Sequence, residues 1–163
     1  MKPAAIGIIY NEDRTHVLLV ERRDVPLLVL PGGGIDAEET PAQAVVREVW
    51  EETGLRVDVV RQIAEYSPIN KLSSQTYVFE CQPKDGILRT GCETASLSYY
   101  SLNNLPKNTF VVHRAWLNDA LLNVSEIIRK DISQVTYLEV FKYFCKHPTQ
   151  VVKYLLKNSP MGP

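Results

Sequence analysis

The stretch from Gly33 to Leu55, GGIDAEETPAQAVVREVWEETGL, decides the fold of this chain. Five residues separate Gly33 from Glu39, and seven more lead to Arg47, where the run REVWEETGL begins. Glycines therefore flank a segment that is dense in glutamate and carries aliphatic residues at regular intervals. This pattern predicts a helix that is entered through a glycine-rich turn and left through a glycine.

Residues at both ends of this segment predict where the helix begins and where it ends. Thr40 is suited to the N-cap, Pro41 to the first helical position, and Gln43 to the reciprocal bond of a capping box. Gly54 accepts the left-handed conformation that ends many helices. Between these residues we expect a helix of about four turns, at ~3.6 residues per turn.

The glutamates of this helix share one face. At roughly 100° per residue, Glu48, Glu51 and Glu52 fall within about one third of the circumference. An apolar face is expected to pack on a β-sheet, so that the acidic face looks away from the sheet. The apolar residues fall on the other side of the helix: Val45, Val46, Val49 and Trp50.

Like charges at this spacing repel each other, which destabilises an isolated helix. A divalent cation bound by hard oxygen ligands offsets the repulsion, and Mg²⁺ characteristically takes a few carboxylates together with substrate phosphates. Glu48 and Glu52, one turn apart, are the first ligand pair, with Glu51 as the third. A solvated acidic helix face is the alternative interpretation, and the glycine-rich entry to the helix favours the metal site.

The turn Pro31–Gly34 follows the apolar run Leu27–Leu30. Consecutive glycines allow backbone groups to approach a ligand closely, and they also make a tight connection between a strand and a helix. Both interpretations are compatible with the sequence. A Walker-type phosphate loop is excluded, because no Gly-Lys-Ser/Thr follows the turn.

With every fixed position filled, residues 33–55 resemble the Nudix box, G-x5-E-x7-R-E-U-x-E-E-x-G-U, in which U is aliphatic. The resemblance implies a Mg²⁺ site, with Mn²⁺ as the substitute, since both ions prefer oxygen ligands. It also implies that Arg47 and Glu39 pair to orient the metal-binding glutamates, and that Gly33 and Gly54 shape the box. The implied metal ligands are the carbonyl of Gly32 and the side chains of Glu48, Glu51 and Glu52.

Length and composition predict one ordinary globular domain. The chain has 163 residues, 45% of them hydrophobic and 23% charged, and a net charge of −1, which predicts no broad attraction to nucleic acid or membrane. Three cysteines without a CxxC pair argue against a disulfide framework or a zinc site. The absence of a signal-like or membrane-spanning apolar run leads us to expect a cytoplasmic protein.

The Nudix resemblance covers roughly residues 4–118 and implies an α/β (α+β) fold, a three-layer α/β/α sandwich with a mixed sheet. We expect this domain to occupy residues 1–124. The local patterns place strands, a turn and a second helix along it. Strands are expected at residues 4–10, 16–21, 55–66, 74–81 and 96–101, the turn at 83–86, and the helix at 110–122.

Residues 125–163 form a C-terminal extension that the resemblance does not explain. Apolar residues recur near helical spacing from Ile132 to Phe144 and again from Val151 to Leu155. This pattern predicts two helices. They either cover the sandwich of the same domain or make a homodimer contact.

Three residues outside the box are candidates by resemblance. Arg23 ends the second expected strand, where related proteins place an arginine on substrate phosphates; the alternative is an exposed strand end. Glu93 matches a loop glutamate that binds metal or acts as base, and Asp85 is the competing carboxylate. Arg114, near the start of the second helix, suits a phosphate or base contact, against the alternative of a surface arginine.

Together these residues imply a Nudix hydrolase that cleaves a nucleoside diphosphate linked to a group X, of the ADP-ribose or nucleotide-sugar type. The products would be a nucleoside monophosphate and phosphorylated X, with Glu51, Glu52, Arg47 and Glu93 in the catalytic set. Glu52 or Glu93 would act as base. The alternatives are a MutT-type nucleoside triphosphate pyrophosphohydrolase and a non-catalytic nucleotide-binding regulator.

Overall fold

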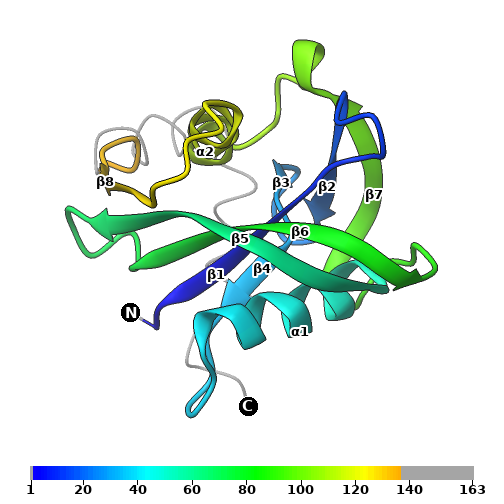
Figure 1. Cartoon of the computed structure of the whole chain (residues 1–163), viewed down its shortest axis with the longest axis horizontal. Coiled ribbons are helices and arrows are strands. Elements are labelled where there is room, and N and C mark those ends of the chain that lie inside the picture. The colour runs from blue at the N-terminus through cyan, green and yellow to red at the C-terminus, as the bar shows by residue number, and fades with distance from the viewer. Residues whose placement is uncertain (1, 137–163) are drawn as a thin grey trace, which may run out of the picture.

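The computed structural model describes residues 2–136. Along the chain, four strands precede the box helix and three follow it, before a second helix and a last strand (Figure 1). The elements are β1 (Ala4–Ile9), β2 (His16–Arg22), β3 (Leu28–Val29), β4 (Gly32–Gly34), α1 (Pro41–Thr53), β5 (Leu55–Pro68), β6 (Thr76–Gly86), β7 (Thr94–Ser101), η1 (Leu102–Asn104), α2 (Val111–Leu121) and β8 (Ile128–Ile132).

The strands form two sheets. The larger sheet has five strands in the order β4-β1-β6-β5-β8, and the smaller has three in the order β3-β2-β7. In the larger sheet β1 runs parallel to β6 and β5 parallel to β8, whereas β1 with β4 and β5 with β6 are antiparallel. The predicted mixed sheet is therefore confirmed.

The two helices lie on opposite faces of the larger sheet (Figure 1). Strand β1 shows how the sequence achieves this, because successive side chains of a strand point to opposite faces. Ile6 and Ile8 join the cluster that contains Trp116 of α2, whereas Ala5 and Ile9 join the cluster of α1. The expected α/β/α layering follows from this alternation.

One predicted turn is wrong. Residues 83–86 continue strand β6, with Pro83 opposite Val57 and Gly86 opposite Leu55 of β5. Pro83 and Gly86 resemble turn residues, but the register shifts between Arg56 and Val57, and a proline is tolerated at such a bulge. Pairing with a long neighbouring strand outweighs the local turn preference.

The predicted helix in the C-terminal extension is wrong in its described part. Residues 128–132 form strand β8, which pairs in parallel with β5 at the edge of the larger sheet. The apolar ends of IRKDI fit a short strand, with Ile132 buried in the core next to α2. The remaining predicted helices lie outside the described residues, and the domain boundary at residue 124 stays a prediction. Within residues 2–136, neither helix is long and apolar enough to cross a membrane.

His113 fastens α2 to the turn before the box. Its Nδ1 accepts a hydrogen bond of 2.8 Å from the backbone N–H of Leu30, and its ring lies 4.7 Å from that of Trp116. Burial lowers the pKa of this imidazole to about 3, and the charge of Arg22 lowers it further. The histidine is therefore neutral in the folded protein at neutral pH.

We predict that His113 makes the protein less stable as the pH falls. Below the ordinary histidine pKa of about 6.5, the unfolded chain binds a proton at this histidine and the folded chain does not. The free energy of unfolding therefore decreases as the pH falls towards about 3. His113→Asn keeps an acceptor for Leu30 but cannot titrate. Urea unfolding at pH 7, 6 and 5 is expected to give a smaller pH-dependent loss in the variant, and equal losses would contradict the assignment.

Candidate active site

The box helix α1 begins and ends as predicted. The Thr40 hydroxyl accepts from the Gln43 backbone at 3.3 Å, while the Gln43 side chain accepts from the Thr40 backbone at 2.9 Å. At the other end Gly54 adopts φ 73° and donates its N–H to the Trp50 carbonyl. These caps fix the helix, and with it the direction in which its glutamates point.

A cleft of about 390 Å³ opens along the acidic face of α1. Four glutamates line it, together with one arginine from β2 and the glycines of β4. Glu48, Glu51 and Glu52 come from the helix, and Glu93 comes from the loop before β7. The structure therefore brings together the glutamates that the sequence singled out. The full lining is Arg22, Gly32, Gly33, Gly34, Glu48, Glu51, Glu52, Gly91, Cys92 and Glu93.

Glu52 is the most enclosed of these carboxylates. Its Oε2 accepts a hydrogen bond of 2.9 Å from the Gly32 backbone N–H. Burial raises the pKa of Glu52 to about 7, and the negative charges of Glu48 and Glu93 add to the shift. The pKa of Glu48 is also raised by burial, against the lowering effect of Arg47. The cleft therefore holds more negative charge than its own cations balance.

Arg47 organises the acidic residues. Its guanidinium grips Glu39 through Nε at 2.8 Å and one terminal nitrogen at 2.9 Å, and the other terminal nitrogen bonds Glu48 at 2.8 Å. The same group reaches the Gly34 carbonyl at 3.0 Å and Glu51 at 3.3 Å. This contact with Arg47 lowers the pKa of Glu39 to about 2. The pair expected between Arg47 and Glu39 is present.

Gly33 explains why the box needs a glycine at its first position. A Cβ atom there would lie 2.5 Å from the Glu48 carboxyl carbon, which is closer than real Cβ contacts. Any side chain would push Glu48 out of the cleft. The requirement comes from close approach between the turn and the helix, rather than from an unusual backbone angle at this residue.

The arginine at the cleft is Arg22 and not Arg23. Arg22 lines the cleft, where its guanidinium bonds Asp24 in a bidentate manner at 2.8 and 2.7 Å. Arg23 is exposed and contributes its backbone N–H to the Glu93 carbonyl at 3.0 Å. The register of β2 against β7 shifts between Glu21 and Arg22, and such a bulge redirects the side chain that follows. No sequence pattern revealed this bulge.

The second helix contributes no group to the cleft. The guanidinium of Arg114 donates to the backbone carbonyls of Leu105, Pro106 and Thr109, so it braces the loop that precedes α2. Asp85, the competitor of Glu93, is exposed on β6 and faces Arg56 at 3.7 Å. Of the two carboxylates, the structure places Glu93 at the cleft.

The donor set suits a hard divalent cation. Carboxylate oxygens line one cleft beside the glycines of β4, as such an ion requires. Within residues 2–136, no three Asp, Glu, His or Cys side chains are gathered closely enough to hold a metal ion as they stand. Arg47 holds Glu48 and Glu51, while Gly32 holds Glu52. Small side-chain movements, with water and phosphate oxygens as further ligands, would complete such a site.

Comparison with known proteins assigns the chain to a family. The profile of the NUDIX domain matches residues 1–120. A MutT-like protein of Streptomyces ambofaciens is 35% identical over 71% of this chain and 73% of its own length. A putative 8-oxo-dGTP diphosphatase of Bacillus subtilis is 35% identical over 71% of this chain and 76% of its own. The chain belongs to the Nudix family and is an enzyme of the hydrolase class.

A solved structure supports the same conclusion. The crystal structure of an ADP-ribose pyrophosphatase from Streptococcus suis superposes with a TM-score of 0.64 and 27% identity. The match covers 80% of this chain and 98% of that one. The expected Nudix-type fold is therefore confirmed.

We predict that Arg47→Lys impairs catalysis without unfolding the protein. Lysine keeps the charge but cannot bond Glu39 through two nitrogens while also holding Glu48. Losing an orienting contact of this kind costs about 10- to 100-fold in activity or metal affinity. Steady-state hydrolysis measured across a Mg²⁺ titration is expected to show this loss. Arg129→Lys, at an exposed pair with Glu65, is the matched control; equal rates in both variants would contradict the role of Arg47.

Proposed function

We propose that this protein hydrolyses a nucleoside diphosphate linked to a group X, of the ADP-ribose or nucleotide-sugar type, in the presence of Mg²⁺. The products are a nucleoside monophosphate and phosphorylated X. The observation that carries the proposal is the cleft in which four glutamates face one arginine from a neighbouring strand. The likeness to a protein described as an ADP-ribose pyrophosphatase supports this substrate class.

The metal ligands in this proposal are Glu48, Glu51 and Glu52 and the carbonyl of Gly32. Oxygen donors of this kind fit Mg²⁺, and Mn²⁺ would serve as a substitute. When bound, such an ion supplies charge neutralisation on the diphosphate oxygens and acidifies a coordinated water. The contribution of Arg47 is to position Glu48 and Glu51 through the bonds that it makes to them.

Arg22 takes the role of phosphate contact that the sequence had given to Arg23. Arginine carries five N–H donors, and the two bonds to Asp24 leave three of them for phosphate oxygens. Asp24 holds the guanidinium in place, which reduces the entropy lost when the substrate binds. Of the substrate-binding residues predicted from sequence, neither Arg23 nor Arg114 lines the cleft.

Two carboxylates remain candidates for the general base. Glu52 lies next to the glycine turn, and Glu93 lines the cleft from the loop before β7. A base must be within hydrogen-bond reach of the attacking water, directly or through one further water. Glu93 is not among the proposed metal ligands, whereas Glu52 is. Substitutions at the two positions therefore separate base catalysis from metal binding.

A MutT-type triphosphate pyrophosphohydrolase is the second candidate. The relatives described as MutT-like and as a putative 8-oxo-dGTP diphosphatase favour it. The same cleft would then act on a triphosphate and release pyrophosphate.

A substrate panel tests the proposal. The protein is incubated with Mg²⁺ and ADP-ribose, nucleotide sugars, diadenosine polyphosphates, or ordinary and oxidised nucleoside triphosphates, and the products are separated by chromatography. Release of a monophosphate and a sugar phosphate from the first two groups supports the proposal. Pyrophosphate released from triphosphates alone would select the MutT-type activity, and no turnover of any compound would select a binding function.

We predict that Glu52→Gln lowers the rate by at least about 10²-fold, the scale of losing a metal ligand or catalytic base. The substitution keeps the size of the side chain and its bond to Gly32 while removing the charge. Glu126→Gln, at an exposed position away from the cleft, is the control. A near-normal rate in Glu52→Gln, with circular dichroism matching the wild type, would refute the role assigned to Glu52.

A further inference from the structure

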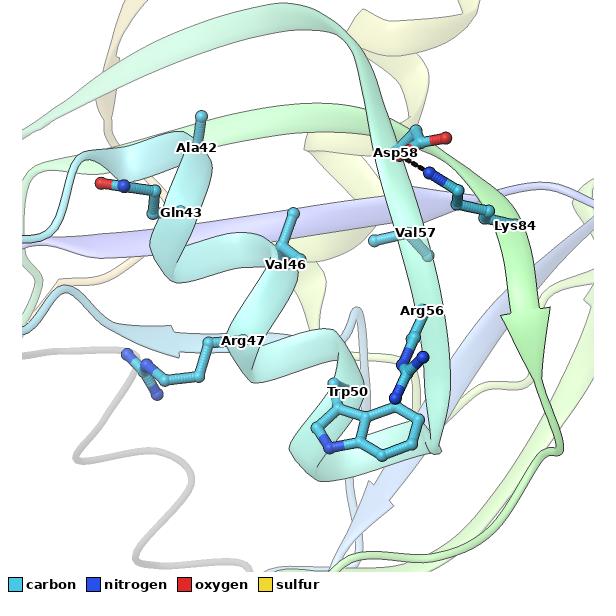
Figure 2. A pocket seen from close by; sticks show the side chains of 9 residues that line it. All are labelled: Ala42, Gln43, Val46, Arg47, Trp50, Arg56, Val57, Asp58 and Lys84. Atoms are coloured by element: carbon cyan, nitrogen blue, oxygen red, sulfur yellow. Dashed lines mark hydrogen bonds and ion pairs between the residues drawn. The ribbon is translucent and has the colours of Figure 1, made fainter.

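A second hollow lies on the other flank of the box helix. It is a groove of about 650 Å³ between α1, the beginning of β5 and the end of β6. Figure 2 shows Trp50 and Arg56 side by side near one end of this groove, with Lys84 and Asp58 further along. No residue lines both the groove and the catalytic cleft, so the two sites are separate surfaces of one helix. Arg47 lines the groove and bonds Glu48 of the cleft.

An apolar stripe forms the helix side of the groove. Ala42, Val46 and Trp50 follow each other at intervals of four residues, and residues so spaced lie on one face of a helix. All three are only half-buried, although Val57 next to them is buried. The sequence predicted that Trp50 would pack on the sheet. The ring instead stands at the rim of the sheet, where part of it remains accessible.

Cationic side chains surround this stripe. The guanidinium of Arg56 lies 5.1 Å from the centroid of the Trp50 ring, and that of Arg89 lies 4.8 Å from it. Both arginines are exposed. A guanidinium stacked on an aromatic ring is held in orientation while its N–H edge stays available to a ligand. The Trp50 ring therefore orients two arginines, and both of them remain exposed to solvent.

A β-bulge adds a third cation. Arg56 pairs with Asp85 and Val57 with Pro83, so Lys84 is the extra residue of β6 at this register shift. A bulge redirects the side chain of its extra residue, and bulges recur at functional sites for that reason. Lys84 lines the groove as a result. The bulge therefore places the positively charged side chain of Lys84 at the groove.

The cationic side chains at the groove are only weakly neutralised by nearby carboxylates. Lys84 lies 3.4 Å from Asp58 and Arg56 lies 3.7 Å from Asp85, and all four side chains are more than half exposed. Long, exposed ion pairs contribute little and leave donors free. Arg89 has no carboxylate partner among residues 2–136, and its guanidinium lies over the Trp50 ring. The rim of the groove is therefore ready to accept an anion.

From these contacts we infer that the groove binds a small organic phosphate. Its apolar body lies along the stripe Ala42–Val46–Trp50, and its phosphate is held by Arg56, with Arg89 against the same tryptophan ring. Lys84 adds positive charge further along the groove. Guanidinium groups match phosphate oxygens in geometry, and the volume is that of an ordinary small-molecule site.

Binding is tested without catalysis, in buffer containing EDTA, by tryptophan fluorescence and by calorimetry. Adenosine 5′-monophosphate is the probe, with adenosine and inorganic phosphate as its two halves. Because Trp116 is buried and Trp50 is not, a saturable change in emission reports on the groove. We expect the whole probe to bind, and each half to bind about tenfold more weakly or worse, since each lacks one set of contacts.

The double variant Arg56→Gln with Lys84→Gln is expected to bind the probe about tenfold more weakly or worse, because hydrogen bonds to a charged group are lost. Arg129→Gln with Lys130→Gln removes two exposed cations from β8 and is the matched control. Arg47 is left intact because it holds Glu39 and Glu48.

Three outcomes would overturn the inference. They are no saturable binding up to millimolar probe, equal affinity in the groove and control variants, or affinity lost in Arg22→Gln, which would place the probe in the catalytic cleft. None of these outcomes depends on hydrolysis. A protein that fails to cleave the substrate panel can therefore still bind the probe, and the two proposals stand or fall separately.

Discussion

The guanidinium of Arg47 is the contact on which the rest of the site depends. Glutamates crowded on one helix face repel each other, and the glycine turn must stay close to that face. Arg47 answers both requirements, because it bonds Glu39 before the helix, Glu48 on it and the Gly34 carbonyl of the turn. Its planar fork suits several partners at once in a way that a lysine does not.

The parts that sequence predicted correctly are those fixed by neighbours along the chain. The capping box at Thr40 and the left-handed Gly54 depend on residues within one turn, so their positions could be read directly. The clustering of Glu48, Glu51 and Glu52 follows from helical spacing alone. The location of Glu93 came from the family resemblance, and in the structure it lines the same cleft as these glutamates.

The parts that sequence missed depend on pairing between distant strands. Register shifts between β2 and β7 and between β5 and β6 put Arg22 at the cleft and Lys84 at the groove. Strand β8 likewise forms because β5 offers an edge to residues 128–132, at the start of an extension that was expected to be helical. A pattern that looks only along the chain cannot anticipate which residue a bulge will redirect, because the cause lies in the partner strand.

One helix thus separates two surfaces of opposite electrical character. On one flank, burial and mutual repulsion raise the pKa of Glu52 and Glu48, so the cleft is stabilised when positive charge enters it. On the other flank, arginines stacked on Trp50 present positive charge to the solvent. Because Arg47 lies between the flanks and bonds both Glu48 and Glu51, an anion drawn to the groove would meet the same residue that orders the cleft. The geometry of the helix, rather than the net charge of the chain, sets where anions and cations gather.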